Sequence, residues 1–217
     1  MISGVVWHFV AFVYYANAAC EYDRATRPKF SDPINAKRMR IAHGEDGFSG
    51  KNIYKIFYDC TFEEGAKNWA AQCTPQFSSS SYRITEGETF FATDPKNSLD
   101  ELMNAAADAW YSEKNQSTSN IFTQEDETKR PNFAQVSTSA QIAWGKTSRI
   151  ACAVNKDCVI NGKKQDFVVC RYWPRGNIVN EKIFDEGRGC NTTADCDAFR
   201  ETKCLPDQGL CINFTPD

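Results

Sequence analysis

The chain has 217 residues, a net charge of −3 and ten cysteines, which suits one compact domain with a small appendage. The acidic balance argues against a general phosphate-binding surface, so nucleic acid is not an expected partner. The cysteines are even in number and contain no Cys-x-x-Cys pair, which favours full pairing into disulfides over zinc knuckles.

The first 19 residues contain no Asp, Glu, Lys or Arg, and an apolar run over 9–15 leads into the small residues Ala16, Ala18 and Ala19. This pattern predicts a signal peptide over 1–19, removed before Cys20. The alternative is a transmembrane helix, which needs about 20 apolar residues. Neither this run nor any later segment is that long, so we expect a secreted, extracellular protein.

A first helix is expected to begin at Ser31-Asp32-Pro33. Asp32 can cap the helix, and Pro33 has a backbone angle suited to its first turn. The segment 34–42 continues the helix, and Gly44 predicts its end.

Two capping boxes predict two further helices. In the first, Glu64 reaches back to Thr61; in the second, Ser98 and Glu101 play the same parts. Each helix carries an apolar face at spacings of three and four. The residues on these faces are Phe62, Ala66, Trp69 and Ala70 in one helix, and Leu99, Leu102, Met103, Ala106 and Trp110 in the other.

From residue 140 the pattern changes to short β-branched and aromatic segments at 140–144, 149–154 and 166–172. Asn161-Gly162 is a strong hairpin-turn signal between the last two. Loops are expected at 44–50, at 114–139 and at the serine-rich run 77–82, interpreted as a flexible rim. Helices followed by antiparallel strands indicate an α+β layered domain.

The end of the chain, 179–217, is predicted to be a cysteine-rich tail. So small a segment cannot bury enough apolar surface to offset its ordering entropy. We therefore expect its cysteines to bond among themselves and the tail to be separable near Ile178. These cysteines are Cys190, Cys196, Cys204 and Cys211, which leaves Cys20, Cys60, Cys73 and Cys158 to pair within the main domain.

The segment 167–178 reads Phe-Val-Val-Cys-Arg-Tyr-Trp-Pro-Arg-Gly-Asn-Ile, and its Cys, Tyr, Pro, Gly and Asn resemble a signature of the CAP superfamily of secreted cysteine-rich proteins. The segment 140–154 resembles the family's other signature strand and its cysteine. Residues 58–73 and the run from Gly87 to Phe90 are similar to nematode members known as activation-associated secreted or venom allergen-like proteins. The resemblance runs over about 34–211.

This resemblance implies a three-layer αβα sandwich with an antiparallel sheet over 20–178. It also implies a Cys152–Cys170 disulfide. These two cysteines flank the predicted hairpin, so adjacent strands can bring them within bonding reach.

Members of the superfamily usually build a central cavity from two histidines and two glutamates. By resemblance, the glutamates fall on Glu88 and Glu113. The histidine positions hold Ile34 and Thr138, or Asn132 in a competing register for the second. Neither register restores a histidine.

The missing histidines argue against metal chemistry, because zinc takes three or four protein ligands, mostly imidazole or thiolate. No cofactor is expected. Glu88 and Glu113 could hold Ca²⁺ or Mg²⁺ weakly, could share a proton, or could be hydrogen-bonded scaffold groups, and we favour the last. His43 is the only histidine after the leader, and its place beside Gly44 indicates a surface role at a helix end.

The sequence therefore predicts a secreted, non-catalytic protein that binds a host or self macromolecule. One alternative is a lipid or sterol carrier with an apolar groove between helices; another is a residual enzyme using Glu88 and Glu113. Glycans are predicted on the sequons at Asn115, Asn191 and Asn213. The sequence does not fix the partner or the oligomeric state.

Overall fold

The computed structural model describes residues 20–45, 47, 49–112, 120–124 and 135–214. The expected signal peptide at 1–19 lies outside these residues. Within them, no helix combines the length and the apolar character needed to cross a membrane.

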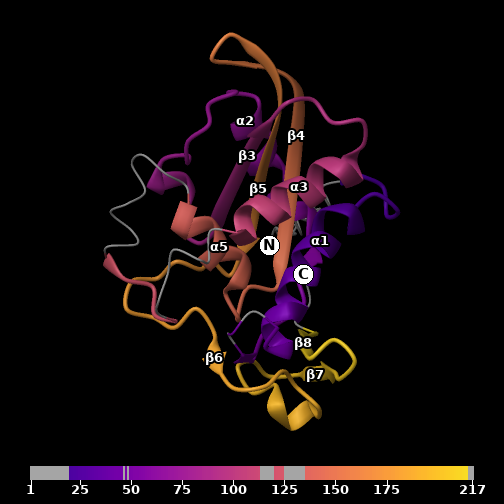
Figure 1. Ribbon diagram of the computed structural model, residues 1–217, viewed down its shortest axis with the longest axis vertical. Helices are drawn as coiled ribbons and strands as arrows, with labels where there is room; N and C mark the ends of the chain where they lie inside the picture. The colour runs from indigo at the N-terminus through magenta and orange to yellow at the C-terminus, as the bar shows by residue number, and fades with distance from the viewer. Residues whose placement is uncertain (1–19, 46, 48, 113–119, 125–134, 215–217) are drawn as a thin grey trace, which may run out of the picture.

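A four-stranded sheet lies between helices on both of its faces (Figure 1). The strand order is β2-β4-β5-β3, with β3, β4 and β5 antiparallel and the short β2 parallel to β4. The sheet strands are β2 (Phe57–Tyr58), β3 (Gly87–Thr93), β4 (Arg149–Ile160) and β5 (Lys163–Trp173). The helices are α1 (Pro28–His43), α2 (Glu63–Ala70), α3 (Leu99–Ser112) and α5 (Gln135–Ala143). The α+β prediction with three layers is confirmed.

The central strands are apolar on both sides because each side meets a different helical layer. On β5, Val168, Cys170 and Tyr172 belong to the core shared with α1, α3 and α5. The alternating residues Phe167 and Val169 pack instead with α2. Strand periodicity thus distributes one apolar run between two cores.

Strands β4 and β5 form the predicted hairpin. Asn161 and Gly162 both have left-handed backbones, with φ of 52° and 77°, as a two-residue type I′ turn requires. Cys152 lies directly opposite Cys170 in the register, with a Cα–Cα distance of 4.1 Å. The predicted Cys152–Cys170 disulfide is confirmed.

Two helix starts differ from the sequence prediction. Helix α1 begins at Pro28, so Pro33 lies inside the helix. The preceding turn fixes this start, because Asp23 accepts a hydrogen bond from the Thr26 amide at 2.7 Å. The predicted capping box at Thr61 and Glu64 was also wrong. Asp59 caps a 3-10 turn at Cys60–Phe62 instead, and α2 begins at Glu63.

Helix α3 follows its prediction, since Ser98 Oγ accepts a hydrogen bond from the Glu101 amide at 3.1 Å. The segment 140–144 was predicted as a strand but lies largely in α5, which also begins inside the loop expected at 114–139. Residues 138–145 are all buried. A segment buried on every side has no polar face from which a helical period can be recognised.

Two polar residues of α1 bind backbone groups in the interior. Asn35 exchanges hydrogen bonds with Ile56, donating to its carbonyl at 2.9 Å and accepting from its amide at 2.8 Å. Arg38 is fully buried, and its guanidinium donates to five carbonyls, those of Tyr54, Ile142, Trp144, Gly145 and Thr147. Burial lowers the pKa of Arg38 to about 9, which still leaves the group charged at neutral pH.

The tail contributes strands to two small two-stranded sheets. One pairs β1 (Gly50–Lys51) with β6 (Asp185–Glu186), and the other pairs β7 (Thr202–Leu205) with β8 (Leu210–Asn213). Its cysteines bond among themselves, as predicted, and the remaining four pair within the main domain. The bonds are Cys190–Cys204 and Cys196–Cys211 in the tail, and Cys20–Cys60 and Cys73–Cys158 outside it.

The tail packs against the main domain, and these contacts argue against the separable module expected from the sequence. Figure 1 shows α1 running down toward β7 and β8, and Gly189 donates to the carbonyl of Ala42 near the end of α1. The Tyr54 side chain is buried among the four tail cysteines. In the other direction, Phe184 and Leu210 belong to the main core.

Candidate functional site

Glu88, the glutamate expected in the central cavity, is buried near the start of β3 and held by four hydrogen bonds or ion contacts. One carboxylate oxygen accepts from the Ser78 amide at 2.7 Å. The other accepts from Ser78 Oγ at 2.9 Å and lies 3.0 Å from Arg171 Nη2. Arg83 Nε lies 3.9 Å from the first oxygen. Glu88 is therefore a scaffold group, as favoured from the sequence.

The register of the sheet explains the Glu88–Arg171 ion pair. Glu88 on β3 is directly opposite Arg171 on β5, so the two side chains share one face. Arg171 is 3% exposed, and it also donates to the Tyr82 carbonyl at 3.1 Å. Two buried charges are tolerated here because each satisfies the other and both have further hydrogen bonds.

These groups do not fit the zinc centre that the family cavity implies. Both oxygens of Glu88 already accept hydrogen bonds, and Arg171 places a positive charge where a cation would bind. Close groups of metal-ligating side chains among the described residues are Cys190 with Cys196 and Cys204, and Cys20 with Cys60 and Glu63. All of those cysteines are in disulfides.

Of the other residues expected in the cavity, the structure describes Ile34 and Thr138. Ile34 is fully buried in the core with α3 and the sheet. Thr138 is also fully buried. Neither is among the residues that line the pocket next to Glu88, and their assignment as cavity residues stays a prediction. Glu113 and Asn132 lie outside the described residues, and a pairing of Glu88 with Glu113 stays a prediction.

His43 is at the C-terminal end of α1, where it was placed from the sequence, and its ring lies 3.8 Å from Glu45. Of the three sequons, Asn191 is exposed and Asn115 lies outside the described residues. Asn213 is 5% exposed, and its side chain contacts Arg149 and Ser148. A glycan on Asn213 would displace these contacts, so its prediction is at odds with the fold.

A small polar pocket of about 90 Å³ opens beside Glu88. Gly87 and Gln141 shape its wall: a Cβ on residue 87 would lie 1.9 Å from Gln141 Oε1, so any other residue here would displace the Gln141 side chain. Gln141 also accepts a hydrogen bond from the Gly176 amide at 2.9 Å. Burial and the nearby charge of Glu88 raise the pKa of Glu86, which also lines the pocket.

The segment 78–86, termed the arginine-pinned loop, borders this pocket. Arg83 Nε donates to the Ser78 carbonyl at 2.9 Å, and Arg171 holds the Tyr82 carbonyl. The Arg175 amide donates to the Thr85 carbonyl at 3.3 Å. From the sequence, the start of this loop was interpreted as a flexible rim, and these contacts hold it in place instead.

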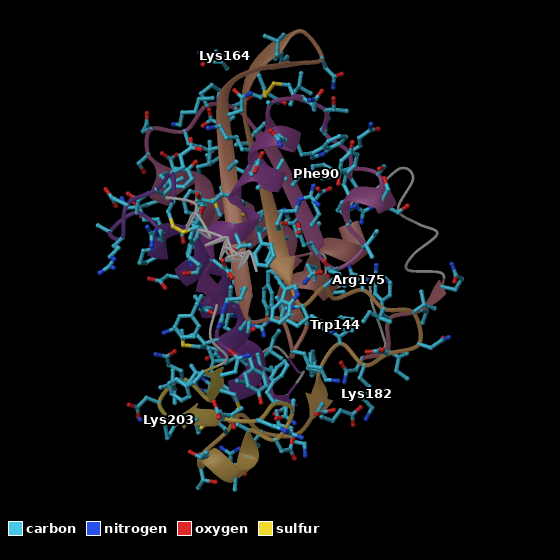
Figure 2. All side chains as sticks on the ribbon, turned by 180° about the vertical axis from the view of Figure 1, so that it is seen from behind. Phe90, Trp144, Lys164, Arg175, Lys182 and Lys203 are labelled. Atoms are coloured by element: carbon cyan, nitrogen blue, oxygen red, sulfur yellow. A yellow bond between two sulfur atoms is a disulfide. The ribbon has the colours of Figure 1, made fainter. Side chains whose placement is uncertain are left out.

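The pinned backbone leaves two large apolar side chains in solvent. Tyr82 is 75% exposed and Ile84 is 72% exposed. Arg175, labelled in Figure 2, stands beside them, since its Nη1 donates to the Ile84 carbonyl at 3.4 Å. Sequence reasoning missed this surface. The available signal was the alternation of apolar and polar residues over 82–85.

Comparisons with known proteins agree with this fold. A model of the cysteine-rich secretory protein family, CAP, matches residues 32–172. Ancylostoma secreted protein of Ancylostoma caninum is 26% identical over 198 residues, covering 86% of this chain and 44% of the relative. The chain thus spans less than half of that relative. Hookworm platelet inhibitor 1 of the same organism is 26% identical, covering 89% of this chain and 90% of the relative.

Among solved structures, BmVAL-1 is similar with a TM-score of 0.73 and 28% identity. The match covers 91% of this chain and 98% of that structure. The similarity therefore extends over both the sandwich and the cysteine-rich tail.

Proposed function

The chain belongs to the cysteine-rich secretory protein (CAP) family, and from that premise we propose that it acts outside the cell as a non-catalytic protein that binds a macromolecular partner. The partner class we favour is a host protein in a host–parasite setting. One relative is named for platelet inhibition, and inhibition of that kind requires a binding surface.

The arginine-pinned loop is the observation that carries this proposal. Tyr82 and Ile84 offer apolar contact area on a backbone already ordered by arginine side chains. A pre-ordered surface loses little conformational entropy when a partner binds. Tyrosine and arginine are also the residue types that concentrate binding energy in protein interfaces.

The Glu88 network supports a role without catalysis. Its carboxylate is buried and ion-paired, which leaves it without access to a substrate. Within the described part of the chain, His43 contacts Glu45 and makes no hydrogen bond to a serine or cysteine nucleophile. The arrangement lacks the nucleophile–base pairing that acyl transfer needs.

The test is a binding survey against an array of extracellular domains of vertebrate cell-surface proteins. The intact secreted protein is compared with a Tyr82→Ala/Ile84→Ala variant and with Val159→Ala as the matched control. Val159 is 66% exposed but lies near the β4–β5 turn. Loss of two central apolar contacts should weaken binding about tenfold or more, and the control should bind like the parent protein.

Equal binding by the parent protein and the loop variant would assign the interaction to another surface. Native mass spectrometry of the secreted protein addresses the lipid or sterol carrier. A co-purifying lipid together with no protein partner would favour the carrier and contradict the proposal.

A further inference from the structure

A second concavity, termed the α1 groove, lies between the start of α1 and strand β2. Its volume is about 380 Å³, and its walls include Arg24, Arg27, Ser31, Asp32, Lys55 and Phe57. Strand β2 is at one edge of the sheet and β3, with Glu88, is at the other. The α1 groove is therefore a different place from the arginine-pinned loop, and ligand binding in it is independent of the proposed function.

Three cations in the α1 groove have no carboxylate within ion-pair distance among the described residues. Arg27 donates from Nε to the Tyr22 carbonyl, and Lys55 Nζ donates to Gln208 Oε1 at 3.2 Å. Both of these partners are neutral. Arg24 forms no ion pair there either. The single acid of the walls, Asp32, lies beyond ion-pair distance of all three, so the groove carries a net charge of about +2 at neutral pH.

This local charge contrasts with the rest of the molecule. The whole chain has a net charge of −3. The neighbouring Lys29 on α1 is paired with Asp100 at 2.7 Å, and Lys67 is paired with Glu21 at 2.8 Å. A cluster of unpaired cations in a concave wall focuses positive potential and favours an anionic ligand.

The floor of the α1 groove is ordered before any ligand binds. The Lys55 amide donates to the Cys211 carbonyl at 2.7 Å, and the Phe57 amide donates to the Ser148 carbonyl at 2.9 Å. Phe57 is 39% exposed, and the Arg149 guanidinium lies 6.0 Å from the centroid of its ring. The groove thus combines cationic side chains with an aromatic surface.

We propose that the α1 groove binds a small organic anion whose phosphate or sulfate group is carried on a ring-sized apolar body. Arg24 and Arg27 provide planar donor groups that suit phosphate and sulfate oxygens, and Lys55 adds a point charge. Phe57 contacts the apolar body. A volume of about 380 Å³ lies within the range of small-molecule sites, and it is far larger than one inorganic anion needs.

The experiment is an NMR titration of the intact protein with phenyl phosphate and, in parallel, phenyl sulfate at low salt. Inorganic phosphate and phenol serve as probes of the two halves of the ligand. We expect saturable shifts at the Arg27, Ser31 and Phe57 amides with a Kd tighter than about 1 mM for at least one phenyl ester. The stronger ester identifies the anionic group. Inorganic phosphate and phenol should each bind about tenfold more weakly.

Three variants localise the binding. Arg27→Gln/Lys55→Gln should weaken the phenyl ester about tenfold or more, because it removes two of the three unpaired cations. Phe57→Ala should remove the preference for the ester over inorganic phosphate. Lys29→Gln is the matched control on the same helix and should leave the affinity unchanged. Because Arg24 is exposed, Arg24→Gln offers a second test should the double variant fold poorly.

Several results would overturn the proposal. They are the absence of saturable binding, unchanged affinity in Arg27→Gln/Lys55→Gln or in Arg24→Gln, and an equal loss in Lys29→Gln. An equal loss in Lys29→Gln would mean that the phenyl ester binds to positive surface charge in general and not to the α1 groove.

Discussion

At the scale of single residues, the position that the resemblance assigns to a cavity glutamate holds one half of a buried ion pair. The resemblance located Glu88 correctly, but only the structure reveals Arg171 opposite it and Ser78 beneath it. Arg171 lies inside the segment 167–178, but it is not one of the residues that carry the family resemblance. Nothing in that segment therefore indicated that Arg171 forms an ion pair. The two partners lie 83 positions apart in the sequence, which left no local pattern to detect.

Replacing Glu88 with glutamine should strongly destabilise the protein. Glu88→Gln removes the carboxylate 3.0 Å from Arg171 and leaves only Glu86, at 3.8 Å, to balance the guanidinium. Breaking a buried ion pair by removing one partner costs about 3–5 kcal/mol. Urea unfolding measures this change in the free energy of unfolding. The exposed Glu186 on β6 provides the control, since Glu186→Gln should change stability by less than about 0.5 kcal/mol. A cost below about 1 kcal/mol for Glu88→Gln would mean that Glu86 or solvent, and not Glu88, balances the charge of Arg171.

At the scale of elements, the sequence predicts those with a local signal. The end of α1 at Gly44, the Ser98 cap of α3 and the β4–β5 turn each depend on residues within four positions of one another. Prediction failed where the structure of a segment depends on residues that are distant in the sequence. The segment 140–144 is helical among residues buried on all sides, and β3 was not predicted because its pairing with β5 joins residues more than 70 positions apart.

The type I′ turn of the hairpin gives an element-scale prediction. Gly162 has φ of 77°, and a Cβ there would meet no atom within 4 Å. The cost of Gly162→Ala is therefore backbone strain alone, about 1–2 kcal/mol. Asn161→Gly is the matched control, because glycine adopts the left-handed conformation of residue 161 freely and should cost less than about 1 kcal/mol. Thermal unfolding of both variants checks the difference, and equal melting temperatures would refute the turn assignment.

At the scale of the whole molecule, the cysteine-rich tail continues the core of the sandwich. The pairing of the four tail cysteines with one another was predicted correctly from the sequence. Two contacts were missed: Tyr54, from the main domain, packs among these cysteines, and Phe184 and Leu210 return to the main core. The prediction counted only the apolar residues within the tail. It could not show that tail residues are buried against the main domain. The boundary between 20–178 and 179–217 accordingly marks a change in composition, and the two parts share one packed interior.

A chain that ends at Ile178 should therefore lose much of its stability. Removing the tail exposes Tyr54 and vacates the positions of Phe184 and Leu210, whose burial contributes about 1.5–3 kcal/mol each. The summed loss approaches the roughly 5–15 kcal/mol that keep a typical domain folded. We expect a melting temperature lower by roughly 10 °C or more, or no cooperative transition, in a calorimetric scan of chains beginning at Cys20. The matched control ends after Phe214, which is 55% exposed, and should melt like the full chain. Equal melting of the Ile178 chain and the full chain would restore the separable tail, because it would show that the contacts of Tyr54, Phe184 and Leu210 add little to the folding of the sandwich.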